Sequence, residues 1–422
     1  MADFVITPSS LNGTLIVPPS KSHTLRAVLF AALAHGMSRI EQYLPSPDTH
    51  AMIEAVRLLG ADVEQKGTTL TVKGLGGAPQ VADDVIQCGN SGQVLRFVGA
   101  LAGLMPQYTI LTGDASIRSN RPIRPLLDGL NQLGAEAHST RGDGFAPIVI
   151  KGPLKKRYAI VDGADSQPIS GLLIAGALSP QGLELDVVNP GEKPWVALTL
   201  HWFKQLNIPY QQEGFTKYRL PGNARIQGFD YTVPGDFSTA AFPIAAALVT
   251  RSTLTLENID MSDVQGDKAL LFVLEKMGAN FSFQGRTLTI HPSQLKGMRI
   301  DINDFVDALP ILSVIGCYAE GTTEITGAAI ARRKESDRIA CITKELKKMG
   351  ASIEEKPDGL IVHNSPLRGA TIDAHRDHRL GMALSVAALG AAGESVIQGT
   401  EYIAKTYLNF TRDFQAIGVS IS

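Results

Sequence analysis

The sequence has few cysteines, and this excludes two classes of protein. It holds three in 422 residues, Cys88, Cys317 and Cys341. An odd number without metal-ligand spacing argues against both a disulfide framework and a zinc site. We therefore expect reduced thiols and no bound metal.

Long hydrophobic runs are also missing. No apolar stretch approaches the roughly 18 residues that a membrane-spanning helix needs. The segment from Met1 to Gly13 lacks the basic start and apolar core of a secretory signal. We therefore expect a cytoplasmic protein with no membrane partner.

Neither sign of charge dominates the chain. Lysine and arginine total 39 against 41 aspartates and glutamates, which leaves a formal net charge of −2. This balance creates no general attraction for nucleic acid, so any anion site must be local. The hydrophobic content of 44% is ample for a core, and the length suggests two or more domains.

The sequence does contain one pattern that occurs six times. Each copy reads as the end of a helix, a turn residue and two short strands, as in "LLGADVEQKGTTLTVKG" and "KMGANFSFQGRTLTIHP". The turn residues recur about every 70 residues, as expected for repeated structural units. They are Gly60, Gly134, Asn207, Gly278, Gly350 and Gly418.

A second recurring element lies between these hairpins. It is a polar loop followed by a helix that is apolar nearly all round, which is typical of a helix buried inside a domain. The loops begin at Pro19, Gly89, Gly163, Pro234, Asn303 and His375. Together the two elements predict an α/β fold (α+β) built from six βαβαββ units.

The two ends of the chain predict how these units are grouped. The last copy, "AIGVSIS", has one strand, whereas the opening "FVITPSSLNGTLIVPP" reads as two strands joined at Asn12 and Gly13. We therefore expect one three-unit domain at residues 21–232 and a second at residues 1–20 and 233–422. Two crossing strands would form the hinge, with a cleft between the domains. We expect the chain to be a monomer.

Polar and cationic residues gather in the loops before the apolar helices. Lys21, Ser22 and Arg26 start one helix, although the helix dipole disfavours cations at that end unless an anion is bound. Helix N-termini themselves favour anions. Similar positions hold Asn90, Gly92, Arg121, Ser166, Gln167, Lys334, Arg338, His378, Arg379 and Lys405, with carboxylates among them at Asp48, Asp236, Asp307, Glu335, Asp337 and Asp377. This set predicts a site for substrates that carry phosphate and carboxylate groups.

Each loop motif also has a purely structural explanation. "RRKESDR" resembles a solvated helix face with ion pairs, "DHR" a local salt bridge and cap, and "GNSG" a turn. Their shared position in a repeated unit favours the anion site.

Eight motifs, in order along the whole chain, carry a family resemblance. They are "PPSKSHTLR", "GNSGQVLR", "RPIRPLLDGL", "DSQPISGLL", "PGDFSTAAF", "RRKESDR", "DHRLGMAL" and "AKTYLNF". With them the chain resembles the 5-enolpyruvylshikimate-3-phosphate (EPSP) synthase family. The resemblance implies two domains of three units each and no metal or organic cofactor. It also implies transfer of the enolpyruvyl group of phosphoenolpyruvate to the 5-hydroxyl of shikimate-3-phosphate, with release of phosphate from a tetrahedral intermediate.

The resemblance also implies roles for individual residues. Asp307 would accept the hydroxyl proton and Glu335 would act as acid and base at the methylene carbon, with Lys21 and His378 offsetting developing charge. Residues implied to bind shikimate-3-phosphate are Lys21, Ser22, Arg26, Ser166, Gln167, Asp307 and Lys334. Those implied to bind phosphoenolpyruvate are Lys21, Asn90, Gly92, Arg121, Gln167, Arg338, Arg379 and Lys405. In this family the inhibitor glyphosate occupies the phosphoenolpyruvate site beside the glycine.

Three positions depart from the family pattern. Asp165 replaces a common serine, Trp195 a common tyrosine, and Ile330 a frequent asparagine. Asp165 would place a carboxylate near a bound phosphate unless it points away or caps a backbone N–H.

Two alternative functions stay open at this point. One is the related enolpyruvyl transferase that acts on UDP-N-acetylglucosamine, which carries an asparagine after the N-terminal lysine and a reactive cysteine in a loop of the first domain. Here Ser22 follows Lys21, and "SIRSNRPIRP" contains no cysteine. The other is a non-catalytic anion-binding repeat protein, in which Asp307 and Glu335 would only form ion pairs.

Overall fold

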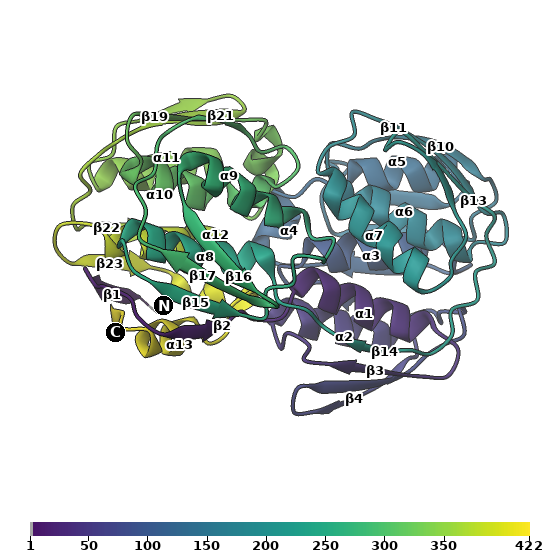
Figure 1. Cartoon of the computed structure of the whole chain (residues 1–422). Coiled ribbons are helices and arrows are strands. Elements are labelled where there is room, and N and C mark those ends of the chain that lie inside the picture. The colour runs from purple at the N-terminus through teal and green to yellow at the C-terminus, as the bar shows by residue number, and fades with distance from the viewer. Residues whose placement is uncertain (1–2) are drawn as a thin grey trace. The chain divides into compact units, whose positions relative to one another are not determined.

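The structure is a computed structural model that describes residues 3–422 and divides into two compact units (Figure 1). Unit 1 comprises the N-terminal residues up to Ser20 together with Pro234–Ser422, and unit 2 comprises Lys21–Val233. Each unit has its own hydrophobic core. Val233 falls in unit 2, one residue beyond the predicted boundary, because its amide donates to the carbonyl of Glu41.

Unit 2 contains three four-stranded sheets with one common strand order. In each sheet the first two strands are parallel and the remaining pairs are antiparallel. The orders are β14(Asp230–Thr232)-β3(Met37–Glu41)-β5(Thr69–Lys73)-β4(Asp62–Lys66), β6(Ile86–Gln87)-β7(Thr109–Thr112)-β9(Ile148–Lys151)-β8(Glu136–Ser139) and β10(Tyr158–Asp162)-β11(Leu183–Val188)-β13(Lys217–Leu220)-β12(Gln211–Glu213).

Unit 1 repeats this arrangement, and both ends of the chain contribute to it. Its sheets are β2(Thr14–Ile16)-β15(Leu254–Glu257)-β17(Thr287–His291)-β16(Asn280–Gln284), β18(Arg299–Asp301)-β19(Thr322–Thr326)-β21(Gly359–His363)-β20(Ile353–Lys356) and β22(Thr371–Asp373)-β23(Ser395–Gln398)-β1(Phe4–Thr7)-β24(Ser420–Ile421). Strand β1 pairs with both β23 and β24. The predicted α/β fold of repeated βαβαββ units is confirmed.

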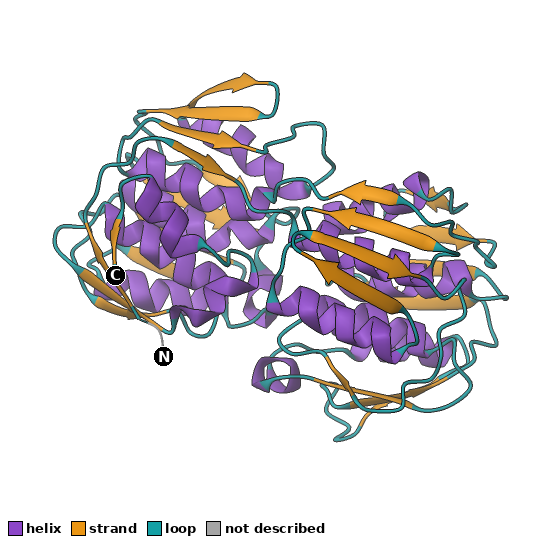
Figure 2. Ribbon diagram, turned by 90° about the horizontal axis from the view of Figure 1, so that it is seen from below, coloured by secondary structure: helices purple, strands orange, loops and turns teal. Residues whose placement is uncertain are grey.

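Six helices are buried along nearly their whole length, as the apolar patterns predict. Within each unit the helices lie between the sheets (Figure 2). Those of unit 2 are α1(Lys21–Leu33), α3(Gly92–Ala102) and α6(Ser166–Leu178); those of unit 1 are α8(Phe237–Val249), α10(Leu309–Tyr318) and α12(His378–Leu389). Because each one follows a polar loop, its N-terminus carries the residues of the predicted site.

The second helix of each of the six βαβαββ repeats is more amphipathic and ends just before a repeated turn residue. These helices are α2(Pro47–Leu58), α5(Arg124–Gln132), α7(Lys193–Gln205), α9(Ala269–Met277), α11(Arg338–Lys348) and α13(Phe410–Ala416). The six turn residues all have positive φ, from +56° at Asn207 to +106° at Gly278. This left-handed conformation ends a helix and favours glycine or asparagine, which explains the repeated residue.

The remaining helical elements are short. They are α4(Ala115–Ser119) and the 3₁₀ turns η1(Gly266–Lys268), η2(Val306–Ala308), η3(Ala329–Arg333) and η4(Thr400–Lys405). Across residues 3–422, no helix combines the length and apolar character needed to cross a bilayer.

Candidate active site

The centre of the site in unit 1 is a buried guanidinium. Arg338, the first residue of α11, donates from Nη1 to Asp307 Oδ1 at 2.7 Å, from Nη2 to Glu335 Oε2 at 2.9 Å, and from Nε to Asp377 Oδ2 at 2.7 Å. Burial lowers the pKa of Arg338, but the three carboxylates outweigh it and hold the pKa above its ordinary value. Removing one partner from so buried an ion group is costly, so the cluster is rigid.

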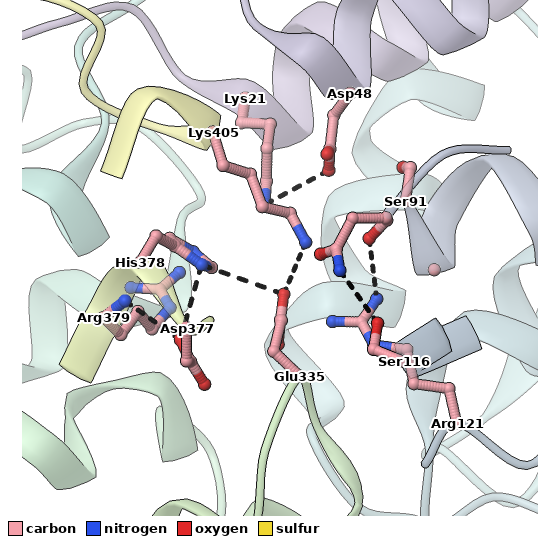
Figure 3. Close-up of polar contacts among 12 residues, drawn as sticks. Lys21, Asp48, Ser91, Ser116, Arg121, Glu335, Asp377, His378, Arg379 and Lys405 are labelled. Carbon is pink, nitrogen blue, oxygen red and sulfur yellow. Dashed lines mark hydrogen bonds and ion pairs between the residues drawn. The ribbon is translucent and has the colours of Figure 1, made fainter. Parts of the chain in front are cut away.

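Glu335 lies between this guanidinium and a lysine. Lys405, at the end of η4, donates from Nζ to Glu335 Oε1 at 2.6 Å (Figure 3). His378 Nδ1 is 3.9 Å from the same oxygen and 3.4 Å from Asp377 Oδ1. Glu335 thus has two cations and an imidazole around one buried carboxylate.

Asp307, in η2, has a second cation besides Arg338. Arg379 Nη2 lies 2.8 Å from Asp307 Oδ2 and also donates to Ser238 Oγ at 3.0 Å. Burial raises the pKa of Asp307, but Arg379, Arg338 and Lys334 outweigh it and hold the pKa well below its usual range. Asp307 is therefore ionised at neutral pH.

The N-terminus of α12 places two of these side chains. Asp377 is the N-cap, and its Oδ1 accepts from the amide of Arg379 at 3.0 Å. Aspartate is favoured at this position because its short carboxylate reaches the free N–H groups of the first turn. His378 and Arg379 follow as the first two helical residues. The sequence indicates Asp377 as a loop carboxylate without a specific role, and its signal is the "DHR" motif at a helix start.

In unit 2, Lys21 and Asn90 lie at helix starts and have acidic neighbours. Lys21 Nζ is 3.5 Å from Oδ2 of Asp48, in the first turn of α2 (Figure 3). Asn90 Nδ2 donates to Asp114 Oδ2 at 2.7 Å and to Ser116 Oγ at 2.8 Å. These contacts orient both side chains before α1 and α3.

Gly92 lies close to three polar side chains, of which Arg121 and Gln167 are predicted site residues. A Cβ at this position would lie 2.5 Å from Arg121 Nη1, 2.8 Å from Arg96 Nη1 and 3.0 Å from Gln167 Oε1. Arg121 also donates to the Asn90 carbonyl at 3.4 Å. The structure therefore brings Asn90, Gly92, Arg121 and Gln167 together.

Arg26 is fully engaged with the protein. Its guanidinium donates to Thr199 Oγ1 at 3.0 Å and to the carbonyls of Ser22 and Trp195 at 3.2 and 3.1 Å. Burial lowers the pKa of Arg26 to about 9. These partners are neutral oxygens, so a bound anion nearby would stabilise the charge. The Ser22 hydroxyl is 3.5 Å from Gln93 Nε2, which donates to it.

Two carboxylates lie at the start of α6. Asp165 caps the helix by accepting from the Gln167 amide at 3.0 Å, and its Oδ2 is 3.0 Å from Arg96 Nη2. The side chain therefore caps a backbone N–H, one of the two placements considered for it. Glu192 Oε2 accepts from the hydroxyl and the amide of Ser166, each at 3.3 Å. Sequence reasoning missed Glu192, whose signal is its place before the Lys-Pro start of α7.

The other residues outside the family pattern have structural surroundings. Trp195 contributes its carbonyl to Arg26, and Ile330 packs against the core of unit 1. Within the described residues, no three histidine, cysteine, aspartate or glutamate side chains group to hold a metal ion.

Comparisons with known proteins agree on one family. The profile of EPSP synthase (3-phosphoshikimate 1-carboxyvinyltransferase) matches residues 5–414. A 3-phosphoshikimate 1-carboxyvinyltransferase of Chlamydia abortus is 44% identical, over 100% of this chain and 95% of the relative. One of Acetivibrio thermocellus is 41% identical, over 99% and 98%. The solved structure of an EPSP synthase from Acinetobacter baumannii superposes with a TM-score of 0.82 at 28% identity, over the full length of both chains.

Proposed function

The chain belongs to the EPSP synthase family, and from this premise we propose that it transfers the 1-carboxyvinyl group of phosphoenolpyruvate to the 5-hydroxyl of shikimate-3-phosphate. The reaction releases inorganic phosphate and belongs to the shikimate pathway of aromatic amino-acid biosynthesis. Relatives at about 40% identity over the full length favour this reaction over the UDP-N-acetylglucosamine transferase and over a non-catalytic protein.

The observation that carries the proposal is the buried cluster of Asp307, Glu335 and Arg338. The addition step needs a base for the 5-hydroxyl proton and an acid for the methylene carbon. Asp307 is ionised and takes the hydroxyl proton as the oxygen bonds to the central carbon of phosphoenolpyruvate. Glu335 acts in its protonated form: it gives its proton to the methylene carbon, which becomes a methyl group, and is left as the carboxylate that accepts from Arg338 and Lys405.

The elimination step reverses the proton transfer at that carbon. Glu335 removes a proton from the methyl group, the double bond forms again, and the carbon–oxygen bond to phosphate breaks. Phosphate leaves with the bonding electrons, so the cations must stabilise negative charge on it. Lys21 and His378 serve this purpose, and such preorganised electrostatics is usually the largest contribution to rate.

The proposed ligands divide by the charge they recognise. The cations proposed for the phosphate and carboxylate of phosphoenolpyruvate are Lys21, Arg121, Arg338, Arg379 and Lys405. The same substrate is proposed to contact Asn90, Gly92 and Gln167. The residues proposed to bind shikimate-3-phosphate are Lys21, Ser22, Arg26, Ser166, Gln167, Asp307 and Lys334. Arg338 and Lys405 both donate to Glu335, so two cations lie together at this carboxylate, which supports their assignment to an anionic substrate. A bound anion would compete with Glu335 for them.

Phosphate release with different substrate pairs tests the reaction. We expect turnover when shikimate-3-phosphate and phosphoenolpyruvate are both present, and none when either is omitted. Release of phosphate with UDP-N-acetylglucosamine and phosphoenolpyruvate would favour the related transferase instead. Binding of both substrates without turnover would favour a non-catalytic protein.

Two variants test the acid–base assignment. We expect Asp307→Ala and Glu335→Ala each to lower kcat by about 10²-fold or more, the range for a positioned proton-transfer group. Both should be less stable than the wild type, because a buried cation loses a partner, but both should fold, because Arg338 keeps two of its three carboxylates. Glu354→Ala is the matched control, since this glutamate is exposed and pairs with the exposed Lys356. Folded Asp307 and Glu335 variants with the rate of this control would contradict the assignment.

We also propose that the chain works in the cytoplasm as a monomer on small-molecule substrates, without nucleic acid. Its net charge of −2 supports the last point, because no excess of positive charge is available for a polyanion. Analytical ultracentrifugation of the purified chain tests whether it is a monomer. A single species near 45.1 kDa is expected, and a species of twice that mass would contradict the monomer.

A further inference from the structure

Helix α11 carries a buried carboxylate, Glu345, two turns after Arg338. Glu345 has a side chain that is 0% exposed, although it takes no part in the proposed chemistry. Burying an ionised carboxylate is unfavourable unless donors surround it. Its donors therefore indicate what the residue is for.

Two of these donors belong to the segment from Asp373, the last residue of β22, to the start of α12, and α11 contacts both β22 and α12. Glu345 Oε2 accepts from the amide of Asp373 at 3.0 Å, and Oε1 is 2.9 Å from Nε2 of His375. Lys348 Nζ, on the same helix, donates to Oε2 at 2.6 Å. Burial alone raises the pKa of Glu345, but hydrogen bonds from Lys348, His375 and the Asp373 amide hold it below its usual value.

This segment has an uncommon backbone conformation. His375 and Arg376 are consecutive non-glycine residues in the left-handed region, with φ of +50° and +56°. Such residues persist only where the surroundings hold them, and they concentrate at functional sites. Two contacts hold this pair: the His375 ring on Glu345, and the His375 amide, which donates to Asp373 Oδ1 at 2.7 Å.

The left-handed pair leads directly into the site. The next residue is Asp377, which caps α12 and accepts from Arg338. His378 and Arg379 follow it. Because the pair comes immediately before the N-cap of α12, its φ angles set the direction in which this helix begins.

We propose that Glu345 is a positioning residue, which holds His375 and so sets the left-handed turn that places Asp377, His378 and Arg379. The inference rests on the proposed function, because that function assigns His378 and Arg379 their roles toward phosphoenolpyruvate. One helix thus carries both Arg338, in the site, and the carboxylate that fixes the neighbouring helix start. Glu345 touches no reacting atom in this scheme.

Two conservative variants separate positioning from bulk stability. Glu345→Gln keeps the shape and one acceptor oxygen but loses the charge. His375→Asn removes the ring while keeping a residue type that tolerates the left-handed conformation. Lys348→Ala is the matched control, because it removes a donor to the same carboxylate that lies on α11 and not on the segment.

The expected result is a loss confined to the second substrate. Glu345→Gln and His375→Asn should each lower kcat/KM for phosphoenolpyruvate by about 10-fold to 100-fold, as small misplacements of catalytic groups do. The KM for shikimate-3-phosphate should stay within about 2-fold, a difference of under about 0.5 kcal/mol. The double variant should lose no more than the worse single variant, since both changes break one contact. Lys348→Ala should match the wild type.

Other outcomes overturn the inference. A lower melting temperature with unchanged kcat/KM would assign Glu345 a structural role only, as would equal losses for both substrates. Additive losses in the double variant would show that the two residues do not act through one contact. A wild-type chain without turnover would instead refute the proposed function, so the two failures are distinguishable.

Discussion

Single residues in this site act through the charges that face them. Arg338 binds three carboxylates, and two of these are the proposed base and acid, Asp307 and Glu335. The guanidinium therefore orients both proton-transfer groups at once. A ligand anion that reaches Arg338 must share it with them, which couples binding to the reactivity of the carboxylates.

The pKa of Asp307 gives a prediction about pH. Burial raises this pKa, and Arg379, Arg338 and Lys334 lower it by a larger amount. Arg379→Gln removes the largest lowering influence, so the pKa should rise. A base works only when ionised, so the acid limb of kcat/KM should move to higher pH in this variant.

The control for this profile is Arg412→Gln, because Arg412 is exposed and pairs with Asp413 on α13. Its acid limb should coincide with that of the wild type. The sign is consistent with stability: a carboxyl with a lowered pKa stabilises the fold above about pH 4, and this contribution is lost as the pH falls. An acid limb for Arg379→Gln that moves to lower pH would contradict the assignment of Asp307 as base.

Gly92 gives a prediction about inhibition. A methyl group there would meet the ends of the Arg121, Arg96 and Gln167 side chains. These ends are flexible, so we expect Gly92→Ala to fold with a nearly unchanged melting temperature. Two of the displaced groups, Arg121 and Gln167, are proposed ligands of phosphoenolpyruvate, so its KM and the inhibition constant of glyphosate should both rise more than the KM of shikimate-3-phosphate. Steady-state kinetics of both proteins measures this.

Gly99 offers the comparison for this variant. It lies on the same helix, but a Cβ there would meet core side chains, with Leu126 Cδ2 at 3.3 Å. Gly99→Ala should change stability and leave the ratio of the two KM values unaltered. If Gly92→Ala behaves in the same way, the glycine is structural and the pocket assignment is wrong.

At the scale of elements, four of the six buried helices begin with the same kind of side-chain cap. Ser91 caps α3, Asp165 caps α6, Asp236 caps α8 and Asp377 caps α12, each by accepting from a backbone N–H of the first turn. The caps end the polar loops at a fixed place, so the next residues project from the first turn of the helix. This explains why the polar motifs occupy the same point in these four repeats; α10, whose N-cap residue is Ala308, has no side-chain cap.

Asp165 allows the cap and the ion pair to be separated. Asp165→Ala removes both, and the lost cap alone should cost about 1 kcal/mol of unfolding free energy. Asp165→Asn keeps the capping oxygen and removes the charge that faces Arg96. We therefore expect Asn to destabilise less than Ala in urea unfolding. Equal losses for both variants would show that the pair with Arg96 dominates.

At the scale of the whole molecule, the N-terminal segment belongs to a unit that is otherwise C-terminal. Strand β1 lies between β23 and β24, and β2 pairs with β15. Removing residues 3–17 should therefore unfold unit 1 and abolish turnover, while unit 2 keeps its own core. Limited proteolysis with mass spectrometry should find a surviving fragment near residues 21–233.

Neighbouring residues of β2 provide a milder test of the same point. Leu15 is 3% exposed and Ile16 is 65% exposed. Leu15→Ala should destabilise the chain by about 2–5 kcal/mol, as core truncations do, and Ile16→Ala should have little effect. For the deletion of residues 3–17, resistance of unit 1 to proteolysis would contradict the dependence of this unit on the N-terminal segment.

The sequence by itself determined the repeated architecture and the start and end of its helices. Strand alternation, apolar helices, capping aspartates and left-handed turn residues are set by neighbours within a few positions, so local physics predicts them. The positions of the cations before the buried helices are also predictable, because the motifs that contain them are local in the sequence. The polar motifs also carried the family resemblance, which the comparisons confirm.

Only the tertiary structure decided which charges meet. Glu335 is a local neighbour of Arg338, but Asp307 and Asp377 come from two other segments, and nothing local to them shows that they face the same guanidinium. The same holds for Arg26 with Thr199, and for Glu345 with His375. Ion pairs and hydrogen bonds act over a few ångströms, whereas, apart from Glu335 and Arg338, these partners are 30 or more positions apart. Their energies exist only once the sheets and helices have packed, because packing alone removes the water that would otherwise solvate each charge.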